Sequence, residues 1–245
     1  MSKKSQPPLP RNARRRAILL EARQRQRAAV RRNIIISAAV MVVSALVIGV
    51  VVLLGNTARE RQLAAGPPAE LVRADSVFLN RVPDAEVTVV EFLDFECPAC
   101  AALYPTMEQT RASYGDRVNF VMRYFPLEGH FNAMPAARAV EAAGRQGQWE
   151  GMYKLMFENQ NRWAGQQVPM DEVFRGFARE LGLDMMSWEA AYNNPATRER
   201  VAADQADGEK LGVSATPTVF LNGEQLQLRS HSDLPEAIEE ALGEQ

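Results

Sequence analysis

The 245-residue sequence contains only two cysteines and two histidines, so it offers few ligands for a soft metal. A structural zinc site needs four ligands, and His130 and His231 are widely separated from each other and from Cys97 and Cys100. The part predicted to fold also has no nucleotide-binding loop, metal cluster or nucleic-acid signature. These absences leave the cysteines as the main chemical feature.

Both cysteines lie in one motif, Cys97-Pro-Ala-Cys100, directly after an apolar, β-branched run at 87–95. The run predicts a buried strand, and Pro98 favours the first turn of a helix. Cys97 is then expected beside unpaired N–H groups and the positive end of the helix dipole, which stabilise a thiolate. A thiolate with a second sulfur three positions on predicts thiol–disulfide exchange. A structural disulfide here would close a loop too short to constrain the unfolded chain much.

Alternation along the same run places Glu91 among apolar side chains, six residues before Cys97. An unpaired carboxylate there should have a raised pKa, which suits a proton relay beneath the second cysteine. A glutamate at a strand edge that reaches solvent fits the periodicity equally well.

The N-terminal region joins a basic arm to a long uncharged run. Residues 1–33 carry eleven Lys or Arg and one acidic residue, Glu21. Residues 34–54 carry no charge, and as a helix they span roughly 31 Å, about the thickness of a bilayer core. We predict a transmembrane signal-anchor helix at 34–54 with a cytoplasmic N-terminus, a linker at 55–70 and an extracytoplasmic domain at 71–245.

Two other interpretations of this region are weaker. A cleavable signal peptide has a shorter apolar core and a small-residue cleavage site, which Gly55 to Ala58 matches poorly. The basic arm is compatible with nucleic-acid binding, but beside an apolar span a topogenic role is favoured. We therefore expect a single-pass protein of the cell membrane with its cysteines outside the cytoplasm. Because both cysteines lie in one motif, we expect them to react with other molecules and not to stabilise the fold.

Apolar periodicity gives the order of the other elements. The expected elements are, in order, an edge strand within 71–78, the central strand, a helix to Tyr114, a parallel strand at 118–125, an inserted helical bundle at about 130–211, a strand ending at Leu221, a returning strand at 224–228 and a helix to Leu242. The insertion holds Trp149, Trp163 and Trp188 at helical spacing, which favours core positions. In Thr216-Pro-Thr218 the proline must begin a strand or follow a cis bond.

This order is that of a thioredoxin fold, an α/β fold, with an inserted all-helical subdomain. Residues from about 71 to 242 resemble the exported DsbA-like thiol:disulfide oxidoreductases, particularly the membrane-anchored kind of Gram-positive bacteria. The matching stretches are Val90 to Cys100, Arg123 to Leu127 with His130, Ala136 to Ala143, and Ala215 to Gly223. The Cys-x-x-Cys motif alone is weak evidence, but its combination with Thr-Pro-Thr and the preceding acid is specific.

The resemblance implies roles for the cysteines and their neighbours. Cys97 is expected to be the exposed attacking thiolate, Cys100 its buried resolving partner, and Glu91 the buried acid beneath them. His130 falls in a recurring element before the first inserted helix, where a structural or capping role is favoured. The resemblance implies no metal and no cofactor beyond the redox-active Cys97–Cys100 disulfide.

The resemblance also implies how substrate is held. Pro217 is expected to be the cis-proline facing the sulfurs, and Thr216 to offer its backbone as a partner strand for the substrate. Pro98 and Ala99 are expected to contact the substrate. Strong oxidants of the family commonly have histidine where this chain has Ala99.

Asp94 and Glu96 add negative charge beside Cys97, which disfavours a thiolate. With Ala99 in place of histidine, we predict a Cys97 pKa below the free value of about 8.5 but well above the roughly 3.5 of the most oxidising member.

The implied function is the introduction of disulfides into exported, cysteine-containing proteins. A membrane redox partner of the DsbB or vitamin K epoxide reductase type is expected to reoxidise the pair. One alternative is a reductase or isomerase, for example in cytochrome c maturation. Another is a thioredoxin-fold binding module or chaperone, which needs neither the two cysteines nor Pro217.

Overall fold

The computed structural model describes residues 41, 48–50 and 71–243, and the first four of these are helical. The predicted basic arm, the linker and most of the predicted membrane span lie outside the described residues. Within the described ranges, no helix combines the length and the apolar composition needed to cross a membrane.

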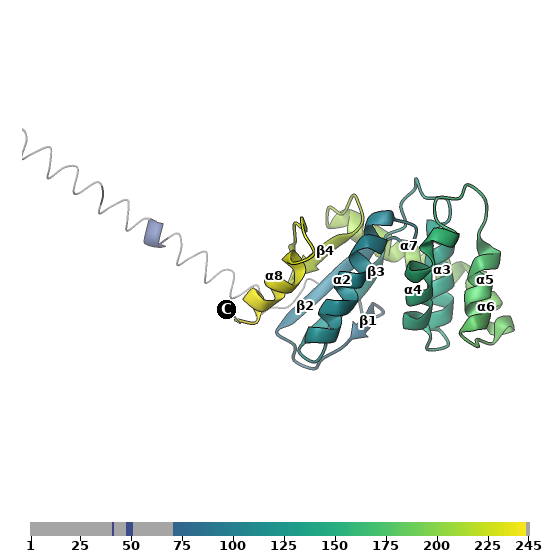
Figure 1. Ribbon diagram of the computed structural model, residues 1–245, viewed down its shortest axis with the longest axis horizontal. Helices are drawn as coiled ribbons and strands as arrows, with labels where there is room; N and C mark the ends of the chain where they lie inside the picture. The colour runs from purple at the N-terminus through teal and green to yellow at the C-terminus, as the bar shows by residue number, and fades with distance from the viewer. Residues whose placement is uncertain (1–40, 42–47, 51–70, 244–245) are drawn as a thin grey trace, which may run out of the picture. The chain divides into compact units, whose positions relative to one another are not determined.

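Five strands form one sheet in the order β1-β3-β2-β4-β5 (Figure 1). The strands are β1 (Val77–Asn80), β2 (Val87–Leu93), β3 (Val118–Tyr124), β4 (Thr218–Leu221) and β5 (Glu224–Gln225). β3 is parallel to β2, as predicted, while β1 and β4 are antiparallel to their neighbours. All seven residues of β2 are buried, because it is the central strand of a sheet covered on both faces.

The helices confirm the predicted insertion. They are α2 (Pro98–Tyr114), α3 (Ala133–Gly144), α4 (Trp149–Glu158), the 3-10 helix η1 (Gln160–Arg162), α5 (Asp171–Glu180), α6 (Met185–Tyr192), α7 (Pro195–Lys210) and α8 (Asp233–Ala241). Elements α3 to α7 separate β3 from β4 in the sequence, and the described chain has no strand between them. Trp149, Trp163 and Trp188 are buried, so they are core residues as predicted.

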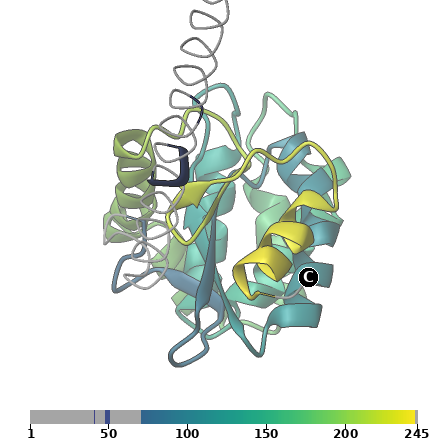
Figure 2. The ribbon, with the colours of Figure 1, turned by 90° about the vertical axis from the view of Figure 1, so that its left-hand side faces the viewer.

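Alternate side chains of β2 enter two separate cores. Val89 and Leu93 belong to the core that also contains Leu103 of α2 and Ile238 of α8. Figure 2 shows α2 and α8 together on one side of the sheet, with α7 on the other. The face that carries Glu91 is therefore the face beneath the cysteine-bearing helix.

Gly208 allows α7 to approach the opposite face of the sheet. A Cβ atom at this position would lie 2.7 Å from Phe125 Cδ2 and 3.0 Å from Phe92 Cδ1. Only glycine therefore fits without displacing the two rings. This packing sets the second core, which also includes Val90 and Leu71.

Two predicted strands have different bounds. The edge strand begins at Val77 instead of 71, because Arg73 and Ser76 hydrogen-bond each other in a turn before it. The returning strand covers only Glu224–Gln225 instead of 224–228. The strand that pairs with it, β4, begins at Thr218, directly after Pro217, which has no backbone N–H to donate to a neighbouring strand.

Candidate active site

Cys97 lies between the central strand and the active-site helix. It is the N-cap residue of α2, with extended backbone angles, and Pro98 occupies the first helical position. Its N–H donates to the Asp94 carbonyl at 3.1 Å, and its carbonyl accepts from Ala101 at 3.2 Å. Both cysteines are free thiols in this structure. The apolar strand followed by proline therefore places Cys97 at the start of the helix, as the sequence predicts.

The expectation of an exposed Cys97 is wrong. Its exposed fraction is 6%, against 1% for Cys100, while Pro98 and Ala99 are exposed. The reason is that a distant loop packs over the sulfur, which lies 3.3 Å from the carbonyl oxygen of Thr216.

The covering loop contains a cis peptide bond between Thr216 and Pro217, one of the two arrangements that the sequence allows. Thr216 is buried beside the Cys97 sulfur. Directly after the proline, Thr218 Oγ1 donates to the Ala215 carbonyl at 2.8 Å. This turn brings the Thr216 carbonyl to Cys97 and places Pro217 in the groove beside Ala99.

The two sulfurs have opposite pKa shifts. The pKa of Cys97 is lowered to about 5, first because Cys100 donates its S–H to it, and then because the Thr216 side chain and the backbone N–H groups of Cys100 and Ala99 also donate; burial opposes this. The pKa of Cys100 is raised well above its ordinary value by burial, by its hydrogen bond to Cys97 and by the Glu91 charge. The pair therefore holds one thiolate, on Cys97, and one thiol.

Glu91 is 3% exposed, so the alternative of a solvent-reaching glutamate at a strand edge is excluded. It lies in the middle of the sheet, opposite Met122 of β3 and Val219 of β4. Its pKa is raised to about 8, first by burial and then by the charges of Cys97 and Glu108. At neutral pH the side chain therefore carries a proton beneath the cysteines.

Asp94 connects the end of β2 to the loop before the insertion. Its buried carboxylate accepts from the backbone N–H groups of Glu96 at 2.8 Å and Leu127 at 3.0 Å, and pairs with His130 Nδ1 at 2.6 Å. Burial raises the pKa of Asp94 although these donors lower it. Partial burial lowers the pKa of His130, but Asp94 outweighs this and the net pKa is raised.

Glu96 holds the insertion in a similar way. Its carboxylate accepts from the backbone N–H of Asn132 at 2.6 Å and of Gly165 at 2.9 Å. The side chain is 2% exposed, although the sequence suggested a free charge beside Cys97. Glu96 thus links two loops of the insertion to the segment that leads into Cys97.

Gln160 is a neighbour of the site that the sequence did not indicate. Its side-chain amide donates to the carbonyl oxygens of Phe95 and Cys97, both at 2.9 Å. No local pattern marks it, because it comes from η1 in the insertion, 63 residues after Cys97. Among the described residues, no group of three or more His, Cys, Asp and Glu is placed to hold a metal ion.

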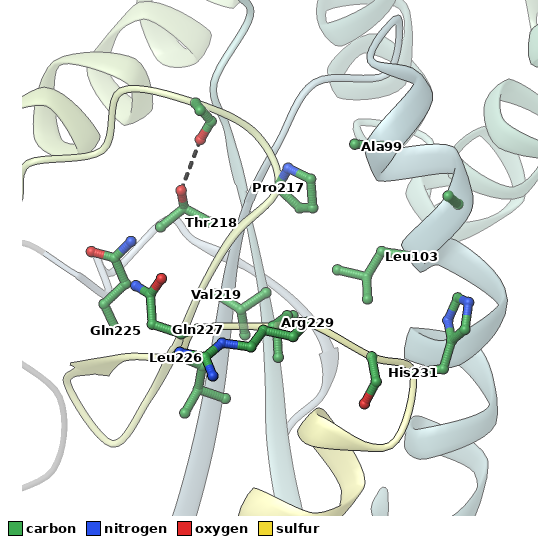
Figure 3. A pocket seen from close by; sticks show the side chains of 14 residues that line it. Ala99, Leu103, Pro217, Thr218, Val219, Gln225, Leu226, Gln227, Arg229 and His231 are labelled. Carbon is green, nitrogen blue, oxygen red and sulfur yellow. Dashed lines mark hydrogen bonds between the residues drawn. The ribbon is translucent and has the colours of Figure 1, made fainter.

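A groove of about 500 Å³ runs beside the cysteine motif. Ala99 and Leu103 of α2 line one wall, and Pro217 and Val219 line the other (Figure 3). Gln225 of β5 and the segment that follows it also line the groove, through Leu226, Gln227, Leu228, Arg229, Ser230 and His231. Residues 224–228 were predicted as strand, so the contribution of this stretch to the groove was missed.

Comparison with known proteins gives the family. A family model described as Thioredoxin matches residues 82–240. A thioredoxin-like oxidoreductase from Silicibacter pomeroyi DSS-3 is 26% identical, with a TM-score of 0.60 over 71% of this chain and 97% of that one. BdbD from Bacillus subtilis is 20% identical (TM-score 0.59; 73% and 96%). The thiol-disulfide oxidoreductase MdbA from Corynebacterium diphtheriae is also 20% identical (TM-score 0.55; 72% and 92%).

Curated relatives match only in part. The Na(+)/H(+) antiporter NhaA 1 of Mycolicibacterium gilvum is 35% identical over 144 residues, 58% of this chain and 22% of that protein. NhaA of Herminiimonas arsenicoxydans is 37% identical over 144 residues, 59% and 22%. The chain thus spans about a fifth of the length of these relatives, and their names describe proteins much longer than the matched segment.

The fold and the family match define the class, a thioredoxin-fold protein whose two cysteines lie at the start of a helix beside a cis-proline loop. The chain belongs to the thioredoxin family.

Proposed function

We propose that this protein introduces disulfides into exported proteins by exchange through the Cys97–Cys100 pair. The observation that carries the proposal is the position of Cys97 at the N-cap of α2, 3.3 Å from the Thr216 carbonyl, with Cys100 buried in the first turn of the helix. The pKa of Cys97 is lowered there, and that of Cys100 is raised. A stabilised Cys97 thiolate lowers the free energy of the reduced pair, so the disulfide is readily given away. The same low pKa makes Cys97 a good leaving group from a mixed disulfide.

The exchange begins with the pair oxidised. A substrate thiolate attacks the Cys97 sulfur, forming a mixed disulfide and releasing Cys100 as a thiolate. A second substrate thiolate then attacks the substrate sulfur of the mixed disulfide and releases Cys97 as a thiolate. The substrate dithiol loses two protons and two electrons, and the pair ends reduced.

Glu91 supplies the proton that the departing Cys100 needs. Burial is the largest cause of its raised pKa and acts in both states of the pair, so Glu91 holds its proton when donation begins; once ionised, its charge raises the pKa of Cys100. In the reverse direction, when the pair is reoxidised, its carboxylate takes the proton from Cys100 so that this sulfur attacks the mixed disulfide. Glu91 therefore acts as acid in one half of the cycle and as base in the other.

Substrate binds across the cysteine motif as an extended chain. The backbone of Thr216 pairs with it as an added strand, and Pro217 presents an apolar ring without an N–H. The exposed Pro98 and Ala99 contact the residues beside the substrate cysteine. The groove lined by Leu103 and Val219 takes the side chains that follow.

The protein acts outside the cytoplasm while held at the membrane. Residues 34–54 form a signal anchor, 55–70 a tether, and a membrane partner of the DsbB or vitamin K epoxide reductase type reoxidises the pair. Protease added to intact cells is expected to remove the domain but not the basic arm. A domain that resists protease until the cells are lysed would contradict this placement.

A trapping experiment tests the exchange. In Cys100→Ala the Cys97 thiolate can still attack a disulfide of an exported protein and release one of its sulfurs, but the pair has no second thiol to break the mixed disulfide, so exported proteins should accumulate on Cys97. The adducts should disappear on reduction and be absent from a matched Cys97→Ala variant. Equal recovery of adducts from both variants, or none from Cys100→Ala, would refute the proposal.

A further inference from the structure

A second cavity, of about 290 Å³, borders the cysteine motif and shares no lining residue with the groove of Figure 3. Glu96 and Pro98, the two chain neighbours of Cys97, form one wall. The insertion forms the rest, through His130, Gln160, Asn161, Ala164 and Gly165. A substrate bonded to Cys97 extends in two directions from its own cysteine, and the groove accounts for only one of them.

His130 presents a free ring nitrogen to this cavity. Its Nδ1 lies 2.6 Å from the Asp94 carboxylate, which is fully buried, while the His130 side chain is 27% exposed. Its Nε2 has no partner among the described residues and is not buried. This nitrogen can therefore bond a ligand in the cavity that the ring lines.

Two amide side chains complete the polar lining. Gln160 uses its Nε2 for the carbonyl oxygens of Phe95 and Cys97, both at 2.9 Å. Its Oε1 is left as an accessible acceptor without a partner in the described chain. Asn161 is exposed, and its amide makes no hydrogen bond within the same ranges. The cavity thus offers both donors and acceptors to a ligand.

The charges around the cavity disfavour a fully charged ligand. Partial burial lowers the pKa of His130, but Asp94 outweighs this, so the ring is readily protonated. An acidic side chain in the cavity would approach the carboxylate of Glu96, whose two oxygens already accept from backbone N–H groups. A basic side chain would approach the His130 ring. A neutral polar side chain meets neither repulsion.

We infer that this cavity binds the carboxamide of an asparagine or glutamine that flanks the reacting cysteine of the substrate. The inference rests on the proposed exchange through Cys97. A protonated His130 donates from Nε2 to the carboxamide oxygen, and the carboxamide NH₂ donates to Gln160 Oε1. When the ring is neutral, Nε2 accepts from the same NH₂ group. A carboxamide therefore fits both states of the histidine, and the insertion selects among substrates.

Competition between peptides tests the inference. The full-length Cys100→Ala chain is loaded as its mixed disulfide with glutathione, and each peptide thiolate attacks the Cys97 sulfur and releases glutathione as a thiolate. Single-cysteine peptides carry glutamine, alanine, glutamate or lysine at one position, and positions on both sides of the cysteine are tested in turn. At equilibrium, mass spectrometry should find the glutamine peptide on Cys97 about tenfold more often than its rivals at one of these positions.

Two substitutions in the same chain locate the preference. His130→Asn keeps a donor for Asp94 at the place of Nδ1 but removes Nε2, and Asn161→Ala breaks no hydrogen bond of the described chain. Each should reduce the preference for glutamine, and the two together should abolish it. Gln167→Ala, an exposed change after η1 that does not line the cavity, is the matched control and should keep it.

Three results would overturn the inference. They are equal binding of glutamine and alanine peptides at every position, a preference for glutamate or lysine, and a preference for glutamine that survives when both His130 and Asn161 are changed.

Failure of the proposed function looks different. If no peptide, the alanine series included, displaces glutathione from Cys97, the exchange itself fails. The same peptides with serine in place of cysteine are then added to the oxidised wild-type chain. The NMR signals of the His130 ring should shift with the glutamine peptide and not with its alanine counterpart. The same response to both peptides would overturn the inference.

Discussion

The sulfur of Cys97 lies 3.3 Å from the carbonyl oxygen of Thr216, a residue 119 positions further along the chain. The contact joins the two halves of the thioredoxin fold across the helical insertion. It also places the backbone that is proposed to pair with substrate directly at the reacting sulfur. The covering of Cys97 and the binding of substrate therefore depend on the same loop.

The first prediction concerns the ionisation of Cys97. In the reduced chain it should titrate with a pKa of about 5, because Cys100 and backbone N–H groups donate to the thiolate. Ultraviolet thiolate absorbance against pH measures the step, and Cys97→Ser should remove it. A step near the ordinary thiol value of 9.0 would contradict the account.

The second prediction concerns how the unfolding free energy changes with pH. Cys97 and Glu91 contribute to this change with opposite signs. Between pH about 5 and 9.0 Cys97 is ionised when folded and protonated when unfolded, so the unfolded chain binds more protons and stability rises with pH. Between pH 4.5 and about 8 Glu91 is protonated when folded and ionised when unfolded, so stability falls as pH rises.

The two variants should separate these effects in urea unfolding of the reduced chain. Between pH 5 and 8, the unfolding free energy should rise with pH more steeply in Glu91→Gln than in the wild type. In Cys97→Ser it should fall instead. If the unfolding free energy changed with pH in both variants as it does in the wild type, neither pKa shift would be present.

The third prediction concerns the proton supplied by Glu91. Glu91→Gln keeps the side-chain size but removes the acid, so disulfide donation at neutral pH should slow by about a hundredfold. The wild-type rate, corrected for substrate thiolate, should fall with rising pH as Glu91 loses its proton, because burial raises the pKa of this carboxyl also when the pair is oxidised. Glu158→Gln, which changes a carboxylate bonded to Tyr104, serves as the control and should keep the wild-type profile. A wild-type rate in Glu91→Gln would exclude its role.

The fourth prediction concerns Asp94. Asp94→Ala leaves the N–H groups of Glu96 and Leu127 without their acceptor and should lower the unfolding free energy by about 2–4 kcal/mol. His130→Ala removes only one contact and should cost about 1–2 kcal/mol. Glu128→Ala, an exposed change in the same loop, should have no measurable effect. Equal losses in all three variants would contradict this ranking.

The order β2–α2–β3 could be predicted because its signals are local. An apolar run gave the strand, and Pro98 fixed the start of the helix, so Cys97 was placed at the N-cap. The burial of Glu91 could be stated only as one of two alternatives. Glu91 is buried because β3 and β4 flank β2 in the sheet, and the periodicity within one strand does not reveal such neighbours.

The surroundings of the sulfur could not be predicted in the same way. Cys97 was expected to be exposed, but Thr216 and Gln160 reach it from distant parts of the chain. Asp94 and Glu96 were expected to add negative charge near Cys97 and so to disfavour a thiolate. Their oxygens instead accept from backbone N–H groups of later loops, and neither is among the main influences on the Cys97 pKa.

The reduction potential of the Cys97–Cys100 pair tests the central claim most directly. The full-length chain is equilibrated with glutathione buffers, and the fraction oxidised is measured; a tenfold change in the equilibrium corresponds to about 30 mV. The proposed oxidase should give a value of about −120 to −180 mV, because the Cys97 thiolate stabilises the reduced form. A value of about −270 mV would contradict the proposal and favour a reductase.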